Sequence, residues 1–302
     1  MNADLLYYLA VFAVMSAIII GAGVMLAKSG DRIADITGLG GLLIGMVLVA
    51  AATSLPEIAV AVSAVLVEES PDLAIGNLFG SNMANMALLA IVDLLWRGKV
   101  WQHVGTGHAR TAAVGISLTA IGVLAVLQPI GIAIGWVGIE SIIIFVGFIN
   151  LIAWTHRSST PAVPTGEVSH ERVTAEDAEH QHLSGADVSS RRAILYTIRW
   201  DLAKFAAAAI VILVSAPILV DAADGIGREA ELGDSFVGAS FLAFSTSLPE
   251  LATAIAAVRI GAFDLAVGSL LGSNAFNMAI IFFVDLFYVE GPILSDVNIA
   301  QA

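Results

Sequence analysis

The sequence contains no cysteine, only three lysines and few charged residues of any kind. Without cysteine, neither disulfide bonds nor thiolate metal sites are available. Charged residues make up 13% of the 302 residues, whereas a soluble domain has about 25%. Apolar runs of about 20 residues recur instead, and this length spans the hydrocarbon core of a bilayer. We therefore predict an all-α polytopic membrane protein whose surroundings are lipid and which binds no nucleic acid.

Two further absences narrow the function. The chain has no nucleotide-binding loop and no arrangement of serine, histidine and aspartate typical of a hydrolase. We therefore predict that it is not an enzyme and needs no cofactor. Its net charge of −13, with the acids mostly in predicted loops, leaves two interpretations open. The loops are ordinary solvated loops, or the surface is adapted to a halophilic prokaryotic host.

Hydropathy predicts eight membrane spans. They cover residues 5–27, 38–66, 72–96, 109–128, 130–155, 201–222, 235–258 and 263–287. The polar segment between the fifth and sixth spans cannot bury a core. We therefore divide the chain into a first repeat of five spans (1–155), a linker (156–199) and a second repeat of three spans (200–302).

Basic residues gather on one side of this eight-span arrangement. They are Lys28, Arg32, Arg97, Lys99, Arg110, Arg157, Arg172, Arg191, Arg192, Arg199 and Arg259. The other side has Arg228 and many acids. Because cytoplasmic loops are enriched in lysine and arginine, we predict a cytoplasmic linker and an N-terminus outside the cell membrane.

The chain contains an internal duplication. The pentapeptide Thr-Ser-Leu-Pro-Glu at Thr53–Glu57 returns 193 positions later at Thr246–Glu250. The segment Gly76–Asn85 is similar to Gly268–Asn277, 192 positions later. Since five spans precede the linker, the second copy enters the membrane with opposite polarity. We therefore predict an inverted-repeat transporter fold.

The offset between the copies also extends to Asp93 and Asp285. By this register, the fourth span corresponds to a position near residue 301. A symmetric parent would have ten helices, so we expect this eight-span sequence to be truncated. We interpret the two aspartates as solvated helix ends, and Glu140 in the fifth span as facing the membrane interface.

Each pentapeptide is expected to break its helix. Pro56 has no N–H and leaves the carbonyl of Ala52 without its helical donor. In hydrocarbon, such a carbonyl is tolerated only where protein or a water-lined cavity satisfies it, and a cation that binds oxygen is a suitable partner. Glu57 lies one turn beyond Thr53 on the same helix face. The second copy repeats this arrangement.

The second motif is expected to line the side of the site opposite the glutamates. Ser81 and Asn85 are four residues apart and share a helix face, as do Ser273 and Asn277. Glycines in these two spans, and in the second span, form small-xxx-small pairs that allow close helix contact. These glycines are Gly41, Gly45, Gly76, Gly80, Gly268 and Gly272.

Together the motifs predict one site built from oxygen atoms. Its ligands are two carboxylates, two amide carbonyls and several hydroxyl groups. Ca²⁺ takes about 6–8 oxygens in flexible geometry, Mg²⁺ prefers a tighter octahedron, and transition metals favour histidine or cysteine. The predicted site residues are Thr53, Ser54, Glu57, Ser81, Asn85, Thr246, Ser247, Glu250, Ser273 and Asn277.

Two acids in one site imply exchange. An unpaired carboxylate in the middle of the membrane costs about 2.5–3.5 kcal/mol on insertion scales. A bound cation can therefore leave only when another cation, or protons, replaces it. A channel filter is the alternative from another class, although filters are usually rings around an axis. A non-transporting scaffold, or glutamates that only cap helices, would not require the symmetric pair.

The motifs resemble the two α-repeats of the cation/Ca²⁺ antiporter superfamily, and its sodium/calcium exchanger branch above all. The resemblance rests on Thr53–Glu57 with Gly80–Asn85, and on Thr246–Glu250 with Gly272–Asn277. It implies a monomeric exchanger that exports Ca²⁺ by using Na⁺ entry. It also implies that Glu57 and Glu250 are the main Ca²⁺ carboxylates and that the other predicted site residues line the Ca²⁺ and Na⁺ positions.

The resemblance further implies alternating access, in which the first and sixth spans slide across the core. One position departs from the family pattern, because such exchangers usually carry aspartate where this chain has Asn277. A site with two glutamates and two asparagines also resembles the cation/proton exchanger branch. Exchange of Ca²⁺ for H⁺ is therefore the alternative to exchange for Na⁺.

Overall fold

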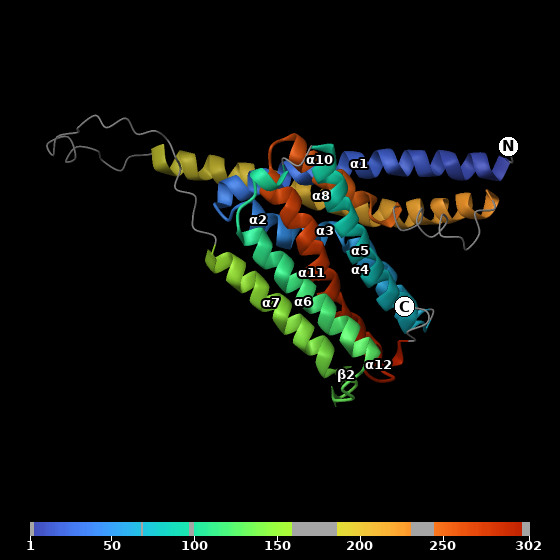
Figure 1. Ribbon diagram of the computed structural model, residues 1–302. Coiled ribbons are helices and arrows are strands. Elements are labelled where there is room, and N and C mark those ends of the chain that lie inside the picture. Colours follow the sequence, from blue (N-terminus) through green and yellow to red (C-terminus); the bar gives the residue numbers. More distant parts are fainter. Residues whose placement is uncertain (1–2, 68, 97–99, 159–185, 231–244, 298–302) are drawn as a thin grey trace.

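The computed structural model describes residues 3–67, 69–96, 100–158, 186–230 and 245–297, almost entirely as helices (Figure 1). The elements are α1 (Ala3–Thr37), α2 (Gly41–Ile44), the π-helical η1 (Gly45–Val49), α3 (Ala50–Thr53), α4 (Leu55–Leu66), α5 (Pro71–Leu95), the 3₁₀-helical η2 (Val100–Gln102), α6 (Gly107–Leu127), β1 (Ala133–Ile134), β2 (Val137–Gly138), α7 (Ile139–Ser158), α8 (Ala186–Glu229), α10 (Leu248–Arg259), α11 (Phe263–Phe287) and α12 (Ile293–Asp296).

The structure confirms a polytopic helical membrane protein. Six helices in the described residues, α1, α5, α6, α7, α8 and α11, are long and apolar enough to cross a membrane. The bent pair formed by residues 41–53 and α4 gives a seventh candidate span. The remaining predicted span, 235–258, ends in α10, and its first part lies outside the described residues.

Three predicted boundaries are wrong. Helix α1 continues ten residues beyond the predicted end at residue 27, and α8 begins at Ala186, inside the predicted linker. The fifth span begins at Ile139, not at residue 130, because residues 130–138 form a turn and the short β1–β2 hairpin. Gly131 and Gly135 adopt positive φ angles of 73° and 68°, which a continuous helix excludes. Hydropathy follows apolar residues and does not register these backbone changes.

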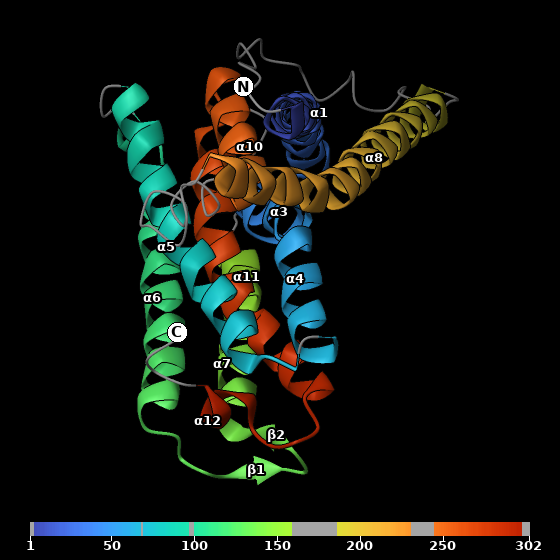
Figure 2. The same cartoon turned by 90° about the vertical axis from the view of Figure 1, so that its right-hand side faces the viewer.

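The two repeats match in length and run in opposite directions. Helices α4 and α10 both have 12 residues, and α5 and α11 both have 25. In Figure 2, α4 runs downward and α10 upward, and α5 and α11 are likewise opposed. Helices α1 and α8 lie side by side and antiparallel across the other long helices (Figure 1). This is the arrangement that an inverted repeat predicts.

Glycines bring α11 into backbone contact with the broken second span. A Cβ added at Gly272 would lie 2.5 Å from the Cα of Met46, and one at Gly45 would lie 2.6 Å from the carbonyl oxygen of Leu265. The small-xxx-small prediction is therefore confirmed for this helix pair. By the repeat offset, Gly76 and Gly80 would meet residues near 238, which lie outside the described residues.

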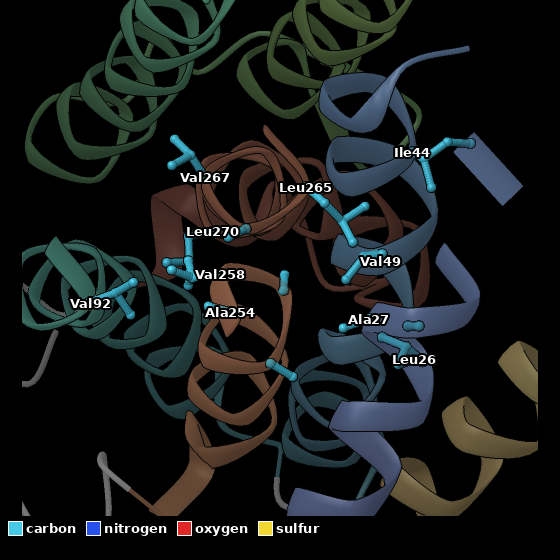
Figure 3. Close-up of a cluster of buried hydrophobic side chains, with 14 of the residues drawn as sticks. Leu26, Ala27, Ile44, Val49, Val92, Ala254, Val258, Leu265, Val267 and Leu270 are labelled. Carbon is cyan, nitrogen blue, oxygen red and sulfur yellow. The ribbon is translucent and has the colours of Figure 1, made fainter. Parts of the chain in front are cut away.

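Aliphatic side chains surround this contact. Figure 3 shows Leu26 and Ala27 of α1, Val49 of η1, and Leu265 and Leu270 of α11 converging in one buried cluster. The cluster also includes Val258 of α10 and Val92 of α5. It fixes the positions of the motif helices relative to one another.

Buried acids anchor two other parts of the fold. Asp285, expected to be solvated, is 1% exposed and accepts hydrogen bonds from the backbone N–H groups of Gly138 and Ile293, both at 2.8 Å, and from the Ser141 hydroxyl. Glu140 is also buried, and it accepts from the N–H of Ile130 at 2.7 Å. These acids hold the β1–β2 hairpin and the turn before α12 against α11. Sequence reasoning missed this because the hairpin has no distinctive pattern.

Candidate ion-binding site

The site begins at two matching helix breaks. Helix α3 ends at Thr53 and α4 begins at Leu55, and the two parts of the span are bent by 46°. Between them, Ser54 has φ −85° and ψ 8°, and Ser247 before α10 has nearly the same angles, −89° and 10°. The prolines occupy the first turn of α4 and α10, where a missing N–H is tolerated. The predicted breaks are confirmed in both repeats.

A π-helical turn precedes the first break and was not predicted. In η1 the backbone N–H groups bond one residue further back than in an α-helix, which adds a bulge before Ala50. Such bulges commonly occur at functional sites. Here the bulge lies in the segment that contacts α11 through Gly45, so it helps to set how Thr53 faces that helix.

Each break presents a glutamate at the start of a half-helix. Glu57 and Glu250 are the third residues of α4 and α10, and each is 3% exposed. The two half-helices run away from the breaks in opposite directions, so both N-termini point toward the middle of the molecule (Figure 2). The positive end of a helix dipole stabilises a carboxylate there. The two carboxylates are close enough for mutual repulsion.

Hydroxyl groups connect these glutamates to the facing helices. The Ser81 hydroxyl of α5 donates to Glu57 Oε1 at 3.5 Å. The hydroxyls of Thr53 and Ser273 lie 3.4 Å apart and join α3 to α11. Thr53 also lies beside the Glu250 carboxylate. The structure thus brings together residues from both repeats that are about 200 positions apart in the sequence.

The remaining predicted residues are also inside the protein. Asn85, Asn277, Ser54 and Ser247 are each no more than 1% exposed, and Thr246 is half-buried. Several oxygens of the predicted site have no hydrogen-bond partner in the described part of the chain. They are Glu57 Oε2, both carboxylate oxygens of Glu250, the side-chain oxygens of Asn85 and Asn277, and the hydroxyl oxygens of Ser54 and Ser247.

Buried oxygens without donors are costly and need a positive partner. Among the described residues, no group of three or more histidine, cysteine, aspartate or glutamate side chains could hold a metal ion. In the part of the chain that the structure describes, the candidate site thus offers two carboxylates, Glu57 and Glu250, together with neutral amide and hydroxyl oxygens. Such a donor set suits a hard cation, as Ca²⁺ prefers oxygen ligands.

Sequence reasoning missed Asn82. This residue is 5% exposed, and its side-chain oxygen accepts a hydrogen bond of 3.2 Å from the Asn277 amide. Asn82 follows Ser81 directly and therefore points about 100° away from the helix face that Ser81 and Asn85 share, so the helical spacing did not include it. The available signal was the duplication, since Asn82 matches Asn274 with the same offset of 192.

Comparison with known proteins agrees with this geometry. The family model described as sodium/calcium exchanger protein matches residues 7–156 and 200–295. The chain belongs to this family. The two matched segments contain both helix breaks and both motif helices of this chain, and the family is one of cation/calcium exchangers.

Relatives of this exchanger-family chain cover most of its length. It is 29% identical over 259 residues to the inner membrane protein YrbG of Escherichia coli, covering 85% of this chain and 72% of YrbG. It is 26% identical over 285 residues to the putative antiporter CaxA of Alkalimonas amylolytica, covering 89% and 79%. A solved structure of the sodium-calcium exchanger NCX_Mj has the same fold, with a TM-score of 0.64, 20% identity, and coverage of 100% of this chain and 86% of NCX_Mj.

Proposed function

We propose that the protein is a secondary active antiporter that exchanges Na⁺ for Ca²⁺ at the Glu57–Glu250 site. The observation that supports this most is the pair of buried carboxylates, because three of their four oxygens lack donors among the described residues. An empty site would hold two charges close together in a medium of low dielectric, where their repulsion is strong. The site therefore changes its access only when one divalent cation, monovalent cations or protons occupy it.

Alternating access follows from the arrangement of the long helices. Helices α1 and α8 pack chiefly on each other and cross the remaining helices, and α10 is the next most extensive contact of α1 (Figure 1). They form a unit that can slide across the core while the four motif segments keep the cage. All predicted ligands come from one chain, so we propose that the protein works as a monomer, with its linker in the cytoplasm.

The second candidate function is exchange of Ca²⁺ for H⁺. The neutral Asn277 favours it, since the site then has no third carboxylate to balance additional Na⁺ ions. The name of NCX_Mj, a sodium-calcium exchanger, favours Na⁺. Uptake of ⁴⁵Ca²⁺ into reconstituted vesicles distinguishes the two when a Na⁺ gradient and a pH gradient are imposed separately. Uptake driven by pH alone would reject Na⁺ coupling.

The carboxylates are tested in the same vesicles. Glu57→Gln and Glu250→Gln should each abolish exchange, because each removes half of the charge that balances Ca²⁺. Asp224→Asn is the matched control, since Asp224 is an exposed acid on α8 paired with Arg228 at 3.1 Å. Normal exchange in either glutamine variant would overturn the site. Ca²⁺ flux that needs no counter-gradient and no exchange partner would instead indicate a channel.

A further inference from the structure

The amide of Asn82 is held by two acceptors that fix its orientation. Its nitrogen donates to the backbone carbonyl of Asn274 at 3.3 Å and to the Thr119 hydroxyl at 3.4 Å. A carbonyl oxygen can only accept. The Thr119 hydroxyl already donates its hydrogen to the carbonyl of Gly115 at 2.9 Å, so it too accepts from Asn82. The nitrogen of Asn82 must therefore face these two groups.

This orientation determines that of Asn277. With its nitrogen turned to Asn274 and Thr119, Asn82 presents its side-chain oxygen to Asn277, which donates to it at 3.2 Å. The nitrogen of Asn277 is thus engaged, and its oxygen is left buried with no donor among the described residues. Asn277 is 0% exposed, so no solvent can provide that donor.

The two repeats differ at this link. The counterpart of the Asn277–Asn82 bond would join Asn85 to Asn274. In the described residues, however, the side-chain oxygens of Asn85 and Asn274 both lack a hydrogen-bond partner. Among the residues that the structure describes, it is the asparagine of the second repeat, Asn277, that a neighbouring amide locks.

From this geometry we propose that Asn82 is a positioning residue, which directs the side-chain oxygen of Asn277 toward the transported Ca²⁺ and makes it a fixed ligand. The proposal rests on the proposed function, because Ca²⁺ is the ion at the site. Asn82 does not touch the ion, and it acts only through Asn277. A ligand oriented in advance needs no reordering when the ion binds, which strengthens binding.

The test measures Ca²⁺ self-exchange, as uptake of ⁴⁵Ca²⁺ into vesicles loaded with unlabelled Ca²⁺. Asn82→Leu removes both the acceptor and the donor. It should raise the KM for Ca²⁺ about tenfold, as expected for the loss of one buried hydrogen bond, with little change in the maximal rate. Met83→Leu is the control, because Met83 is the next residue of α5 and is 76% exposed.

A double-mutant cycle separates positioning from simple packing. In an Asn277→Ala background there is no amide left to orient, so adding Asn82→Leu should not raise KM further. Fully additive increases, or an Asn82→Leu KM equal to that of Met83→Leu, would overturn the proposal. If Asn277→Ala shows no uptake, the cycle cannot be completed, and the comparison of the KM of Asn82→Leu with that of Met83→Leu decides for or against the proposal. If the Asn82→Leu protein does not insert into the membrane, Asn82→Ser is used in its place, because serine removes the amide without adding bulk.

Failure of this inference differs from failure of the proposed function. Self-exchange requires neither Na⁺ nor a pH gradient, so an error in the coupling ion leaves the KM comparison readable. If the unmodified protein shows no Ca²⁺ self-exchange, the proposed function itself fails. Normal self-exchange with an unaffected Asn82→Leu variant rejects the positioning role alone.

Discussion

Gly272 offers the most demanding test of how the fold positions the site. In Gly272→Ala, the new Cβ would lie 2.5 Å from the Cα of Met46 and 2.7 Å from its carbonyl oxygen. Both obstacles are backbone atoms, which cannot rotate away. Ordinary contact requires at least about 3.4 Å, so α11 and η1 must separate by about 1 Å. Overpacking of this kind costs about 1–3 kcal/mol.

The same displacement reaches the ion site through the next residue. Ser273 lies 3.4 Å from the Thr53 hydroxyl, at the limit of a hydrogen bond, so a shift of about 1 Å breaks this link between α3 and α11. We expect Gly272→Ala to lower the thermal midpoint in detergent and to raise the KM for Ca²⁺. The two effects should appear together because one contact controls both.

Gly115→Ala is the matched control. Gly115 is also a buried glycine of a membrane helix, α6, but an added Cβ would meet no described atom within 4 Å. Alanine is favoured over glycine in a helix by up to about 1 kcal/mol, so this variant should keep or raise the thermal midpoint. If Gly272→Ala and Gly115→Ala melt alike and transport with the same KM, the close contact does not set the geometry of the site.

Three further predictions concern charge. Arg32→Gln should destabilise the protein by up to about 1 kcal/mol, because Arg32 is half-exposed and the buried Asp201, 3.6 Å away, keeps Lys204 at 3.9 Å. Combined with Asp201→Asn in thermal unfolding, it should cost less than the sum of the two single losses, and additive losses would contradict the pairing. Asp285→Asn should lower the free energy of unfolding by about 2–4 kcal/mol, because the new amide N–H group would face the backbone N–H of Gly138 or Ile293. The equivalent change in the first repeat, Asp93→Asn, should be nearly neutral in the same thermal-unfolding assay. Ca²⁺ at 100 times its dissociation constant should stabilise the protein by about 2.7 kcal/mol, and equal stabilisation of Glu250→Gln would refute the site.

Much of the site could be predicted because the same motif occurs twice, so each copy supports the interpretation of the other. A proline and a glutamate at one position of an apolar span have several explanations, but the same pair in a second, inverted copy has few. The matching angles at Ser54 and Ser247 show that the repeated pentapeptide dictates the same break twice. The helical spacing of Ser81 and Asn85 then placed both residues on α5 as buried members of the site.

The remaining features depend on contacts that the sequence does not display. Helices α1 and α8 extend past their apolar residues, and the buried Asp201 of α8 lies 3.6 Å from Arg32, in a part of α1 that was predicted to be a loop. Asp285 is buried because a hairpin about 150 positions away and the turn before α12 both fold onto it. Such residues look like ordinary helix ends until their partners are known.

The link between Asn82 and Asn277 also accounts for the departure from the usual family pattern. An ionised aspartate at position 277 would bring a carboxylate against the side-chain oxygen of Asn82, where Asn277 now donates at 3.2 Å. Turning Asn82 over would only move its oxygen against the carbonyl of Asn274. Either arrangement leaves two buried acceptors facing each other, which costs about 1–3 kcal/mol or more. A neutral amide at position 277 is therefore what its described neighbours require, and the proposed site has its carboxylates at Glu57 and Glu250 alone among the described residues.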